Sequence, residues 1–336
     1  MSFKVHVEPS GHEFNVDAGE TILDAAIRQG VNLPYGCRNG FCGNCQSTLL
    51  SGELGYPEGA PPALDENQQD ACLTCQGVPH SDIRLEVQEI AQAQDIEIRE
   101  MPCKVDRIER LNEDVIRLYI KLPEGERLQF LAGQYINFIL ENGDKRAFSI
   151  ANAPHDDQFI ELHIRHVAGG AFTDFLFEGM QEKTIMRIEA PLGSYFLRED
   201  SDRPIILMGG GTGFAPLKGI IEHAFEIGVE RPIHLYWGVR AQSDLYLPDL
   251  PEEWAKQHTN FSYIPVLSEP NGDWAGRSGW VHDSVIADYP DLSAFEVYMS
   301  GPPPMIEAGK DAFLAHGLSE DHLYSDSFEY AAAVDK

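Results

Sequence analysis

Basic side chains and long apolar stretches are both scarce in this sequence. It has 25 Lys and Arg residues against 54 Asp and Glu residues, which gives a formal net charge of −29 at pH 7. Nucleic acids and anionic membrane surfaces attract proteins through clustered Lys and Arg side chains, so neither is expected as a partner. No apolar run reaches the roughly 18 residues that a membrane-spanning helix needs. Glycines interrupt the most apolar segment, residues 204–221.

The first residues, MSFKVHVEPSGHEF, contain no apolar segment of the kind that a secretory signal peptide has. A cytoplasmic location is therefore expected. Cysteine is also rare outside one region, because five of the six cysteines lie between residues 37 and 75 and Cys103 stands alone. Such clustering is typical of a metal centre rather than of a disulfide framework.

The pattern of apolar residues divides the chain into three modules. Residues 1–94 contain strand-like alternation around one short helix, which Thr21 is placed to cap. Residues 100–199 contain short alternating strands separated by turn residues, the pattern of a small antiparallel barrel. Residues 202–330 alternate strands with helices, which is typical of a doubly wound parallel sheet. The polar segment 91–102 is the expected linker after the first module.

The cysteine-rich loop has a spacing that indicates one kind of iron centre. It reads Cys37-x4-Cys42-x2-Cys45, and Cys75 follows after 29 further residues. This C-x4-C-x2-C…C spacing is that of plant-type 2Fe–2S ferredoxins, in which four thiolates hold two irons. Structural zinc sites usually show paired C-x2-C knuckles, and only one pair here has that spacing. Cys75 is preferred to Cys72 as the fourth ligand because its spacing fits, which leaves Cys72 for packing.

Two segments of the second module have the residue types that a flavin nucleotide requires. In residues 146–149 (RAFS), the Arg suits a phosphate, the aromatic ring can stack on an isoalloxazine, and the hydroxyl can hydrogen-bond to its edge. Downstream, a strand ends at Gly169 and Gly170, and a helix begins near Thr173. The free N–H groups at such a helix start can hold a pyrophosphate. Each segment alone also fits a surface Arg or an ordinary capped helix.

The third module has two loops suited to a nicotinamide nucleotide. Residues 208–216 (MGGGTGFAP) join a strand to a helix, so the glycines let a diphosphate approach the backbone. Residues 300–305 (SGPPPM) follow another strand, although alone they also fit a proline-rich turn that starts a helix. Arg240 ends a strand where the adenosine ribose is expected, with no second basic residue close by. NADH is therefore the favoured donor, with NADPH tolerated.

Together these motifs resemble a plant-type ferredoxin joined to a module of the ferredoxin–NADP reductase superfamily, over nearly the whole chain. The resemblance implies a multidomain α+β fold: an N-terminal β-grasp 2Fe–2S ferredoxin, a six-stranded antiparallel FAD-binding β barrel and a doubly wound α/β NAD(P)-binding domain. The pyrophosphate turn favours FAD over FMN. This sequence departs from the family at two positions, where Phe148 replaces a Tyr and Ser300 replaces a Cys.

The resemblance also implies roles for individual residues. The expected cluster ligands are Cys37, Cys42, Cys45 and Cys75. The residues expected beside the reacting rings are Ser149, Ser300 and Phe328. The residues expected to bind flavin or nicotinamide nucleotide are Arg146, Phe148, Ser149, His163, Gly169, Gly170, Phe172, Thr173, Gly210, Gly211, Thr212, Gly213, Pro216, Arg240, Gly301, Pro302 and Met305.

This combination of centres predicts an electron-transfer reductase. A nicotinamide donates two electrons as hydride, a 2Fe–2S cluster accepts one at a time, and a flavin can do both. The expected acceptor is a partner protein, either a CDP-6-deoxy-glucoseen dehydrase-type protein or an oxygenase component. Two alternatives stay open: a free-flavin or ferric reductase with an accessory cluster, and a redox-sensing module that binds without turnover.

Overall fold

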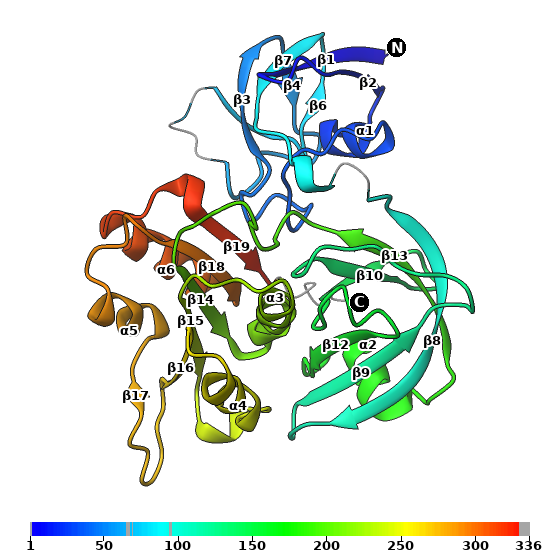
Figure 1. The fold of residues 1–336 in the computed structure, drawn as a ribbon. Helices are drawn as coiled ribbons and strands as arrows, with labels where there is room; N and C mark the ends of the chain where they lie inside the picture. The colour runs from blue at the N-terminus through cyan, green and yellow to red at the C-terminus, as the bar shows by residue number, and fades with distance from the viewer. Residues whose placement is uncertain (1, 65–67, 69, 94–95, 329–336) are drawn as a thin grey trace. The chain divides into compact units, whose positions relative to one another are not determined.

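A computed structural model describes residues 2–64, 68, 70–93 and 96–328. The chain divides into two compact units, Met1–Glu97 and Ile98–Lys336, which are drawn in Figure 1. Each unit has hydrophobic clusters of its own, one in the first unit and three in the second.

The first unit is a mixed five-stranded sheet with one helix packed against it. Its strands run in the order β2-β1-β7-β3-β5, with β1 parallel to β7 and antiparallel to β2. Along β1, Val5 and Val7 are fully buried, because alternate side chains of a strand face the same side. Thr21 caps the helix by accepting a hydrogen bond from the Asp24 N–H (3.2 Å), as the sequence predicts. This is the expected β-grasp arrangement.

The elements of the first unit are β1 (Ser2–Glu8), β2 (Glu13–Asp17), α1 (Ile22–Arg28), β3 (Gln46–Ser51), β4 (Leu54–Gly55), β5 (Ala71–Leu73), β6 (Val78–Pro79), β7 (Ile83–Glu86) and the 3₁₀ turn η1 (Ala91–Ala93).

The second unit begins with a six-stranded antiparallel barrel. Its strands are β8 (Arg99–Arg110), β9 (Val115–Lys121), β10 (Tyr135–Ile139), β11 (Lys145–Ser149), β12 (Ile160–Arg165) and β13 (Ile185–Leu192), in the order β11-β10-β13-β8-β9-β12. A bridge between Ile150 and Leu162 joins the two edges. A single helical turn, α2 (Ala171–Asp174), continues as a π-helix, η2 (Phe175–Gly179), and contributes Phe172 and Leu176 to the barrel core.

A six-stranded, all-parallel sheet follows, in the order β17-β16-β15-β14-β18-β19. Its strands are β14 (Ile205–Gly210), β15 (Ile233–Val239), β16 (Phe261–Leu267), β17 (Arg277–Ser278), β18 (Glu296–Gly301) and β19 (Leu323–Ser327). Its helices are α3 (Phe214–Glu226), α4 (Asp249–Gln257), α5 (Val281–Asp288) and α6 (Pro303–Ala315), with 3₁₀ turns η3 (Gly211–Gly213), η4 (Gln242–Asp244) and η5 (Glu320–His322).

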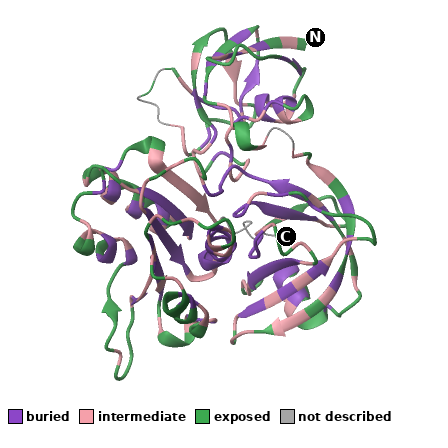
Figure 2. Ribbon diagram, in the orientation of Figure 1, coloured by how far each residue is buried: buried purple, intermediate pink, exposed green. Residues whose placement is uncertain are grey.

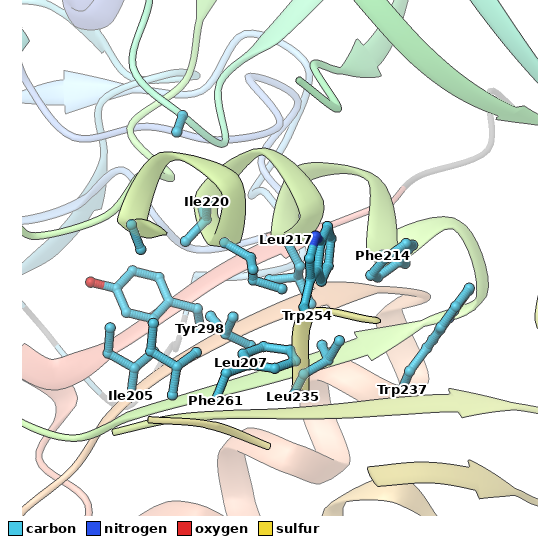
Figure 3. Close-up of a cluster of buried hydrophobic side chains, with 14 of the residues drawn as sticks. Ile205, Leu207, Phe214, Leu217, Ile220, Leu235, Trp237, Trp254, Phe261 and Tyr298 are labelled. Carbon is cyan, nitrogen blue, oxygen red and sulfur yellow. The ribbon is translucent and has the colours of Figure 1, made fainter. Parts of the chain in front are cut away.

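Both faces of this parallel sheet are covered. Ile205 and Leu207 pack in the cluster under α3 and α4, which Figure 3 shows, whereas Ile206 and Met208 pack in the cluster beside α5 and α6. β14 and β18 are therefore buried over their whole length (Figure 2). The near-continuous apolar composition of these strands follows from burial on two sides.

The glycine-rich segment 208–216, called the glycine loop below, lies where the strand order of the parallel sheet changes direction. β14 has β15, the next strand of the sequence, on one side and the later strand β18 on the other. In open α/β sheets, ligands bind outside the carboxyl ends of the strands at such a switch point. The segments after β14 and after β18 are the two loops that the sequence assigns to the nicotinamide nucleotide.

Helix α3 also joins the parallel sheet to the barrel. A Cβ atom at Gly219 would lie 3.0 Å from the Asn152 carbonyl oxygen, so the helix backbone approaches the barrel directly. The Lys218 ammonium, on the preceding residue, lies 3.2 Å from the Ala151 carbonyl oxygen. The barrel and the sheet therefore meet along α3, which lies between them in Figure 1.

Two element boundaries differ from the sequence-based expectation. The strand expected over residues 82–90 is shorter, since β7 spans Ile83–Glu86. The expected linker 91–102 overlaps β8, whose first residues pair with β13 in the register Arg99↔Ala190. Local composition hides this start, because the pairing partner is about ninety residues away in the sequence.

Candidate functional site

The four predicted cluster cysteines form two close thiol pairs in the first unit. The Cys37 N–H donates to the Cys42 sulfur and the Cys42 N–H donates to the Cys37 sulfur, each at 3.4 Å. A hydrogen bond from the Cys42 thiol lowers the pKa of Cys37 to about 5 and raises that of Cys42. Likewise, hydrogen bonding between Cys45 and Cys75 lowers the pKa of Cys75 and raises that of Cys45.

Two pairs of sulfurs suit a two-iron cluster. Among the described residues, no group of three or more His, Cys, Asp or Glu side chains is arranged to hold a single metal ion. A cluster in which four cysteines serve two irons needs two protein sulfurs for each iron, which is the arrangement seen. The thiols of Cys37 with Cys42, and of Cys45 with Cys75, thus fit the group.

Glycines hold the backbone of this loop close to the sulfurs. A Cβ atom at Gly36 would lie 3.1 Å from the Cys42 sulfur, so a side chain would intrude on it. Gly40 has φ +85°, and a Cβ atom there would lie 2.6 Å from the Pro61 Cβ atom. Backbone hydrogen bonds at Gly40 lower the pKa of Cys75, and N–H groups directed at sulfur stabilise thiolates.

The other two cysteines are placed for packing. The Cys72 thiol is 1% exposed and donates to the Ser47 carbonyl oxygen at 3.4 Å. Cys103 lies in the barrel core and is 2% exposed. Burial raises the pKa of each thiol to about 12, as expected for cysteines packed among apolar side chains.

The predicted flavin strand is β11, at the edge of the barrel sheet. The Arg146 guanidinium lies near the surface, 3.2 Å from the Asp144 carboxylate. The Phe148 ring is half-buried and meets Phe138 edge-to-face, with ring centroids 5.8 Å apart. The Ser149 hydroxyl donates to the Asp326 carboxylate at 3.0 Å, which brings β19 of the parallel sheet against this strand.

The predicted pyrophosphate turn has a compact, internally bonded backbone. Gly169 has φ +79°, which favours glycine, and Gly170 is the N-cap of α2. The Thr173 hydroxyl lies 3.0 Å from the Gly170 carbonyl oxygen and holds the turn closed. Phe172 is buried in the barrel core, so its backbone rather than its ring is available to a ligand.

His163 is placed in a buried polar network rather than at a surface. Its side chain is fully buried; Nε2 lies 2.8 Å from Glu161 Oε1 and Nδ1 lies 3.0 Å from the Tyr246 hydroxyl. Burial lowers the pKa of His163. Both ring nitrogens of His163 are thus used inside the protein.

The same network carries a buried ion pair between the barrel and α3. The Lys218 ammonium lies 3.3 Å from Glu161 Oε2 and 2.9 Å from Glu222 Oε2. Burial alone would raise the pKa of Glu161, but the hydrogen bond from His163 and the charge of Lys218 outweigh it and lower the pKa to about 2. Glu161 is therefore ionised at neutral pH.

The two loops of the predicted nicotinamide site interlock without room for side chains. A Cβ atom at Gly213 would lie 1.9 Å from the Ser300 carbonyl oxygen. A Cβ atom at Gly210 would lie 2.6 Å from the Met305 sulfur and 2.9 Å from Pro302 Cδ. Glycine is therefore required where the segments after β14 and β18 meet.

The end of the described chain lies beside this junction. In the β18–β19 register, Ser300 is opposite Asp326, and the Phe328 N–H donates to the Gly301 carbonyl oxygen at 2.9 Å. The Ser300 hydroxyl is buried and has no hydrogen-bond partner among the described residues. Buried hydroxyls without a partner are uncommon in folded proteins.

The guanidinium of Arg165, which the sequence analysis does not single out, lies next to Gly211 of the glycine loop. A Cβ atom at Gly211 would lie 3.4 Å from Nη1 of Arg165, at the end of β12. The Arg165 Nε atom lies 3.3 Å from Asp114 Oδ2, but Nε and Nη2 are buried without a hydrogen-bond partner among the described residues. A half-buried guanidinium with such donors beside a glycine loop suits a diphosphate.

Comparisons with known proteins agree with this geometry. Residues 5–80 match the family described as a 2Fe-2S iron-sulfur cluster binding domain, residues 102–196 an oxidoreductase FAD-binding domain, and residues 207–311 an oxidoreductase NAD-binding domain. CDP-6-deoxy-L-threo-D-glycero-4-hexulose-3-dehydrase reductase of Yersinia pestis is 41% identical over 328 residues, 98% of this chain and 99% of that protein.

The chain belongs to the ferredoxin-type single-chain reductases. The reductase is also 35% identical to the phenol 2-monooxygenase reductase component DmpP of Pseudomonas sp. strain CF600, over 99% of this chain and 96% of that protein. Its fold matches the crystal structure of Amycolatopsis cytochrome P450 reductase GcoB with a TM-score of 0.81 and 33% identity, covering 97% of this chain and 98% of that one.

The reductase is an NAD(P)H-dependent oxidoreductase whose cofactors are a 2Fe–2S cluster, FAD and a nicotinamide nucleotide. It transfers electrons from the nicotinamide through the flavin and the cluster to a partner. In the described part of the chain, no helix is both long and apolar enough to cross a membrane.

Two contacts of the reductase join residues that are far apart in the sequence. Arg165 lies within the segment HIRHVAGG, but its neighbour Gly211 is 46 residues further on. Asp326 lies in the C-terminal segment SDSF, yet its partner Ser149 is 177 residues away. Only the folded chain brings these pairs together.

Proposed function

We propose that Cys37, Cys42, Cys45 and Cys75 hold the 2Fe–2S cluster, with one thiol pair for each iron. The pairing of Cys37 with Cys42 and of Cys45 with Cys75 supports this assignment. The backbone N–H groups of the loop donate to the sulfurs, and such hydrogen bonds tune the potential of a cluster.

The flavin site is assigned to the barrel face at β11 and to the turn before α2. Arg146 is exposed enough to exchange Asp144 for a phosphate, and the half-buried Phe148 ring is placed to pack against the isoalloxazine. The FAD supplies the conversion of a hydride into single electrons. Because the Ser149 hydroxyl donates to Asp326, its lone pairs remain to accept a hydrogen bond from a ring N–H.

The nicotinamide nucleotide is assigned to the interlocked loops at residues 210–213 and 300–305. Close packing of the two loops against each other fixes their backbones, and the N–H groups at the start of α3 favour a diphosphate. The Arg165 guanidinium, next to Gly211, is placed to neutralise the charge of this diphosphate. Arg240, exposed at the end of β15, is placed for the adenosine half, and NADH is the proposed donor.

The catalytic group of residues is proposed to be Ser149, Ser300 and Phe328, and the Phe328 N–H donates to the carbonyl oxygen of Gly301, the residue after Ser300. The domain boundaries are proposed as 1–94, 100–199 and 202–330. The start of β8 and the gap between β13 and β14 support the first two divisions. The end at residue 330 lies outside the described residues.

The proposed acceptor is a partner protein of the deoxysugar-dehydrase type, in the cytoplasm. The 41% identity, over nearly the full length of both chains, to a reductase named for a CDP-6-deoxy-hexulose dehydrase supports this choice. An oxygenase component is the second candidate, because the phenol 2-monooxygenase reductase component is 35% identical over a similar length.

Steady-state oxidation of NADH with cytochrome c, with free flavin and with no added acceptor tests this function. We expect cytochrome c reduction to be fast in the wild type and to fall by more than about tenfold in Cys42→Ser, because the cluster loses an iron ligand. Cys72→Ser is the matched control, since its buried thiol donates to the Ser47 carbonyl and is not assigned to the cluster, and it should keep the activity.

Undiminished cytochrome c reduction in Cys42→Ser would show that electrons leave from the flavin, which favours the free-flavin or ferric reductase. Stoichiometric flavin reduction without turnover on any acceptor would favour the redox-sensing module instead.

A further inference from the structure

Trp237 connects the parallel sheet to the glycine loop through a single hydrogen bond. The residue is fully buried near the carboxyl end of β15, and its indole Nε1–H donates to the Gly211 carbonyl oxygen at 2.9 Å. The indole N–H is the only hydrogen-bonding group of a tryptophan side chain. The one polar atom of this buried residue is therefore directed at the loop that is assigned to the nucleotide diphosphate.

The position of this hydrogen bond determines which way the loop backbone faces. The Gly211–Thr212 peptide unit is planar and trans, so its C=O and its N–H point in opposite directions. Gly211 has φ +54°, a conformation that favours glycine, and its carbonyl oxygen also accepts a hydrogen bond from the Phe214 backbone N–H at the start of α3. With the carbonyl held toward the Trp237 indole, the Thr212 N–H points to the opposite side, away from the sheet core.

Packing holds the indole in the orientation that this hydrogen bond needs. The Trp237 ring stacks on Phe214 with centroids 4.1 Å apart and planes 17° apart, and it meets Tyr246 edge-on at 5.1 Å. Phe214 and Trp237 are labelled at the glycine-loop end of the apolar layer in Figure 3. The Tyr246 hydroxyl in turn contacts His163 Nδ1 at 3.0 Å, and His163 contacts Glu161.

This series of contacts begins on the barrel strand β12 and ends at the glycine loop. It connects the buried His163 network to the loop that is assigned to the nucleotide. Rigid, preorganised donors bind an anion more tightly than donors that must be ordered during binding, because no conformational entropy is lost.

We propose that Trp237 is a positioning residue for the nicotinamide nucleotide: its indole N–H fixes the Gly211–Thr212 peptide so that the Thr212 N–H faces the bound diphosphate. This proposal rests on the assignment of the glycine loop to that diphosphate.

The test measures equilibrium binding of ADP-ribose, which has the diphosphate but no nicotinamide ring. Isothermal titration calorimetry compares the cofactor-loaded wild type with the cofactor-loaded variant. Trp237→Phe keeps an aromatic ring but removes the donor. We expect it to weaken ADP-ribose binding about five- to tenfold, which is the loss of roughly one hydrogen bond. The KM for NADH should rise by a similar factor, while kcat at saturating NADH changes by less than about twofold.

Trp254→Phe is the matched control. Trp254 is buried in the same cluster, with its ring centroid 6.1 Å from that of Phe214, and it makes no contact with Gly211 among those described. This variant should bind ADP-ribose as the wild type does. Equal affinity of Trp237→Phe and Trp254→Phe would overturn the proposal, because it would show that only packing matters. Failure of the wild type to bind ADP-ribose would instead overturn the loop assignment.

A measurement on the unaltered protein covers the case in which Trp237→Phe does not fold. The four tryptophans give four indole signals in nitrogen-15 NMR spectra, and Trp254→Phe and the other single variants assign them. The Trp237 indole proton should exchange slowly with solvent and should shift when ADP-ribose binds, because its acceptor carbonyl belongs to the ligand-binding peptide. An unshifted, rapidly exchanging Trp237 signal would overturn the proposal.

Discussion

At the scale of single residues, the contact between Ser149 and Asp326 joins the flavin strand to the end of the described chain. Ser149 is the last residue of β11 and directly follows the half-buried Phe148. The Asp326 carboxylate accepts a hydrogen bond from the Ser149 hydroxyl, with 3.0 Å between the two oxygens. This hydrogen bond fixes the rotamer of the hydroxyl. The geometry leaves the oxygen lone pairs of Ser149 for a ring N–H.

Replacing Ser149 with alanine is expected to slow reduction of the flavin by NADH by about 10-fold to 100-fold, because one oriented hydrogen bond to the reacting ring is lost. Stopped-flow bleaching of the flavin absorbance measures the rate. Ser149→Thr keeps the hydroxyl and should recover most of it, with the affinity for NADH unchanged in both variants. A Ser149→Ala rate equal to that of the wild type would contradict the role given to this hydroxyl.

At the scale of elements, the sequence predicts features whose partners are close in the chain. The spacing of Cys37, Cys42 and Cys45 predicts the cluster loop, and Thr21 predicts the start of α1. The alternation of strands and helices after residue 202 predicts the doubly wound sheet. Each of these depends on a repeat or a spacing that a short window contains.

Features that depend on distant pairing could not be predicted in this way. Arg165 reaches Gly211 only because β12 and the glycine loop meet in the fold. The polar composition of residues 91–102 indicates a linker, whereas pairing with β13 starts β8 at Arg99. The contact of the His163 ring with the Tyr246 hydroxyl likewise joins residues that are 83 positions apart.

The interlocking of the two nucleotide loops predicts an order of effects for two glycine substitutions. Gly213→Ala would place its Cβ atom 1.9 Å from the backbone oxygen of Ser300, whereas Gly210→Ala meets the flexible side chain of Met305 first. We expect Gly213→Ala to raise the KM for NADH by more than about 100-fold and Gly210→Ala by about tenfold. Each factor of ten corresponds to about 1.4 kcal/mol of binding free energy. Similar KM values for the two variants would show that these loops do not control nucleotide binding.

The buried ion pair between β12 and α3 predicts how stability depends on pH. The pKa of Glu161 is about 2 in the folded protein, against 4.5 for the free side chain. Because the folded value is lower, the stabilisation is fully present above pH 4.5 and is lost as the pH falls toward 2. Glu161→Gln leaves Lys218 with Glu222 alone and should destabilise the second unit by about 2–4 kcal/mol at pH 7.

The denaturant midpoint of FAD release, followed by flavin fluorescence, measures this effect. The difference between wild type and Glu161→Gln should be constant from pH 8 to 5 and should narrow only below about pH 4.5. Glu226→Gln is the control. Glu226 is an exposed carboxylate on α3, the helix that carries Lys218, so its replacement should change the midpoint little. A difference that narrows between pH 8 and 6 would contradict the pKa assigned to Glu161.

At the scale of the whole molecule, the two units supply different parts of one electron path. The thiol pairs belong to the first unit, and the flavin strand and nucleotide loops belong to the second. One chain therefore holds a centre that receives a hydride and a centre that passes on single electrons. Near-complete coverage of relatives that are named reductases agrees with this combination.

Anaerobic titration of the purified protein with NADH, followed by electron paramagnetic resonance, tests this account most directly. We predict that NADH alone produces the signal of a reduced two-iron cluster, with about one electron per chain residing on it, and that the signal is absent in Cys42→Ser while the flavin is still bleached. A wild-type flavin that is fully reduced by NADH while the cluster stays oxidised would contradict transfer between the two centres.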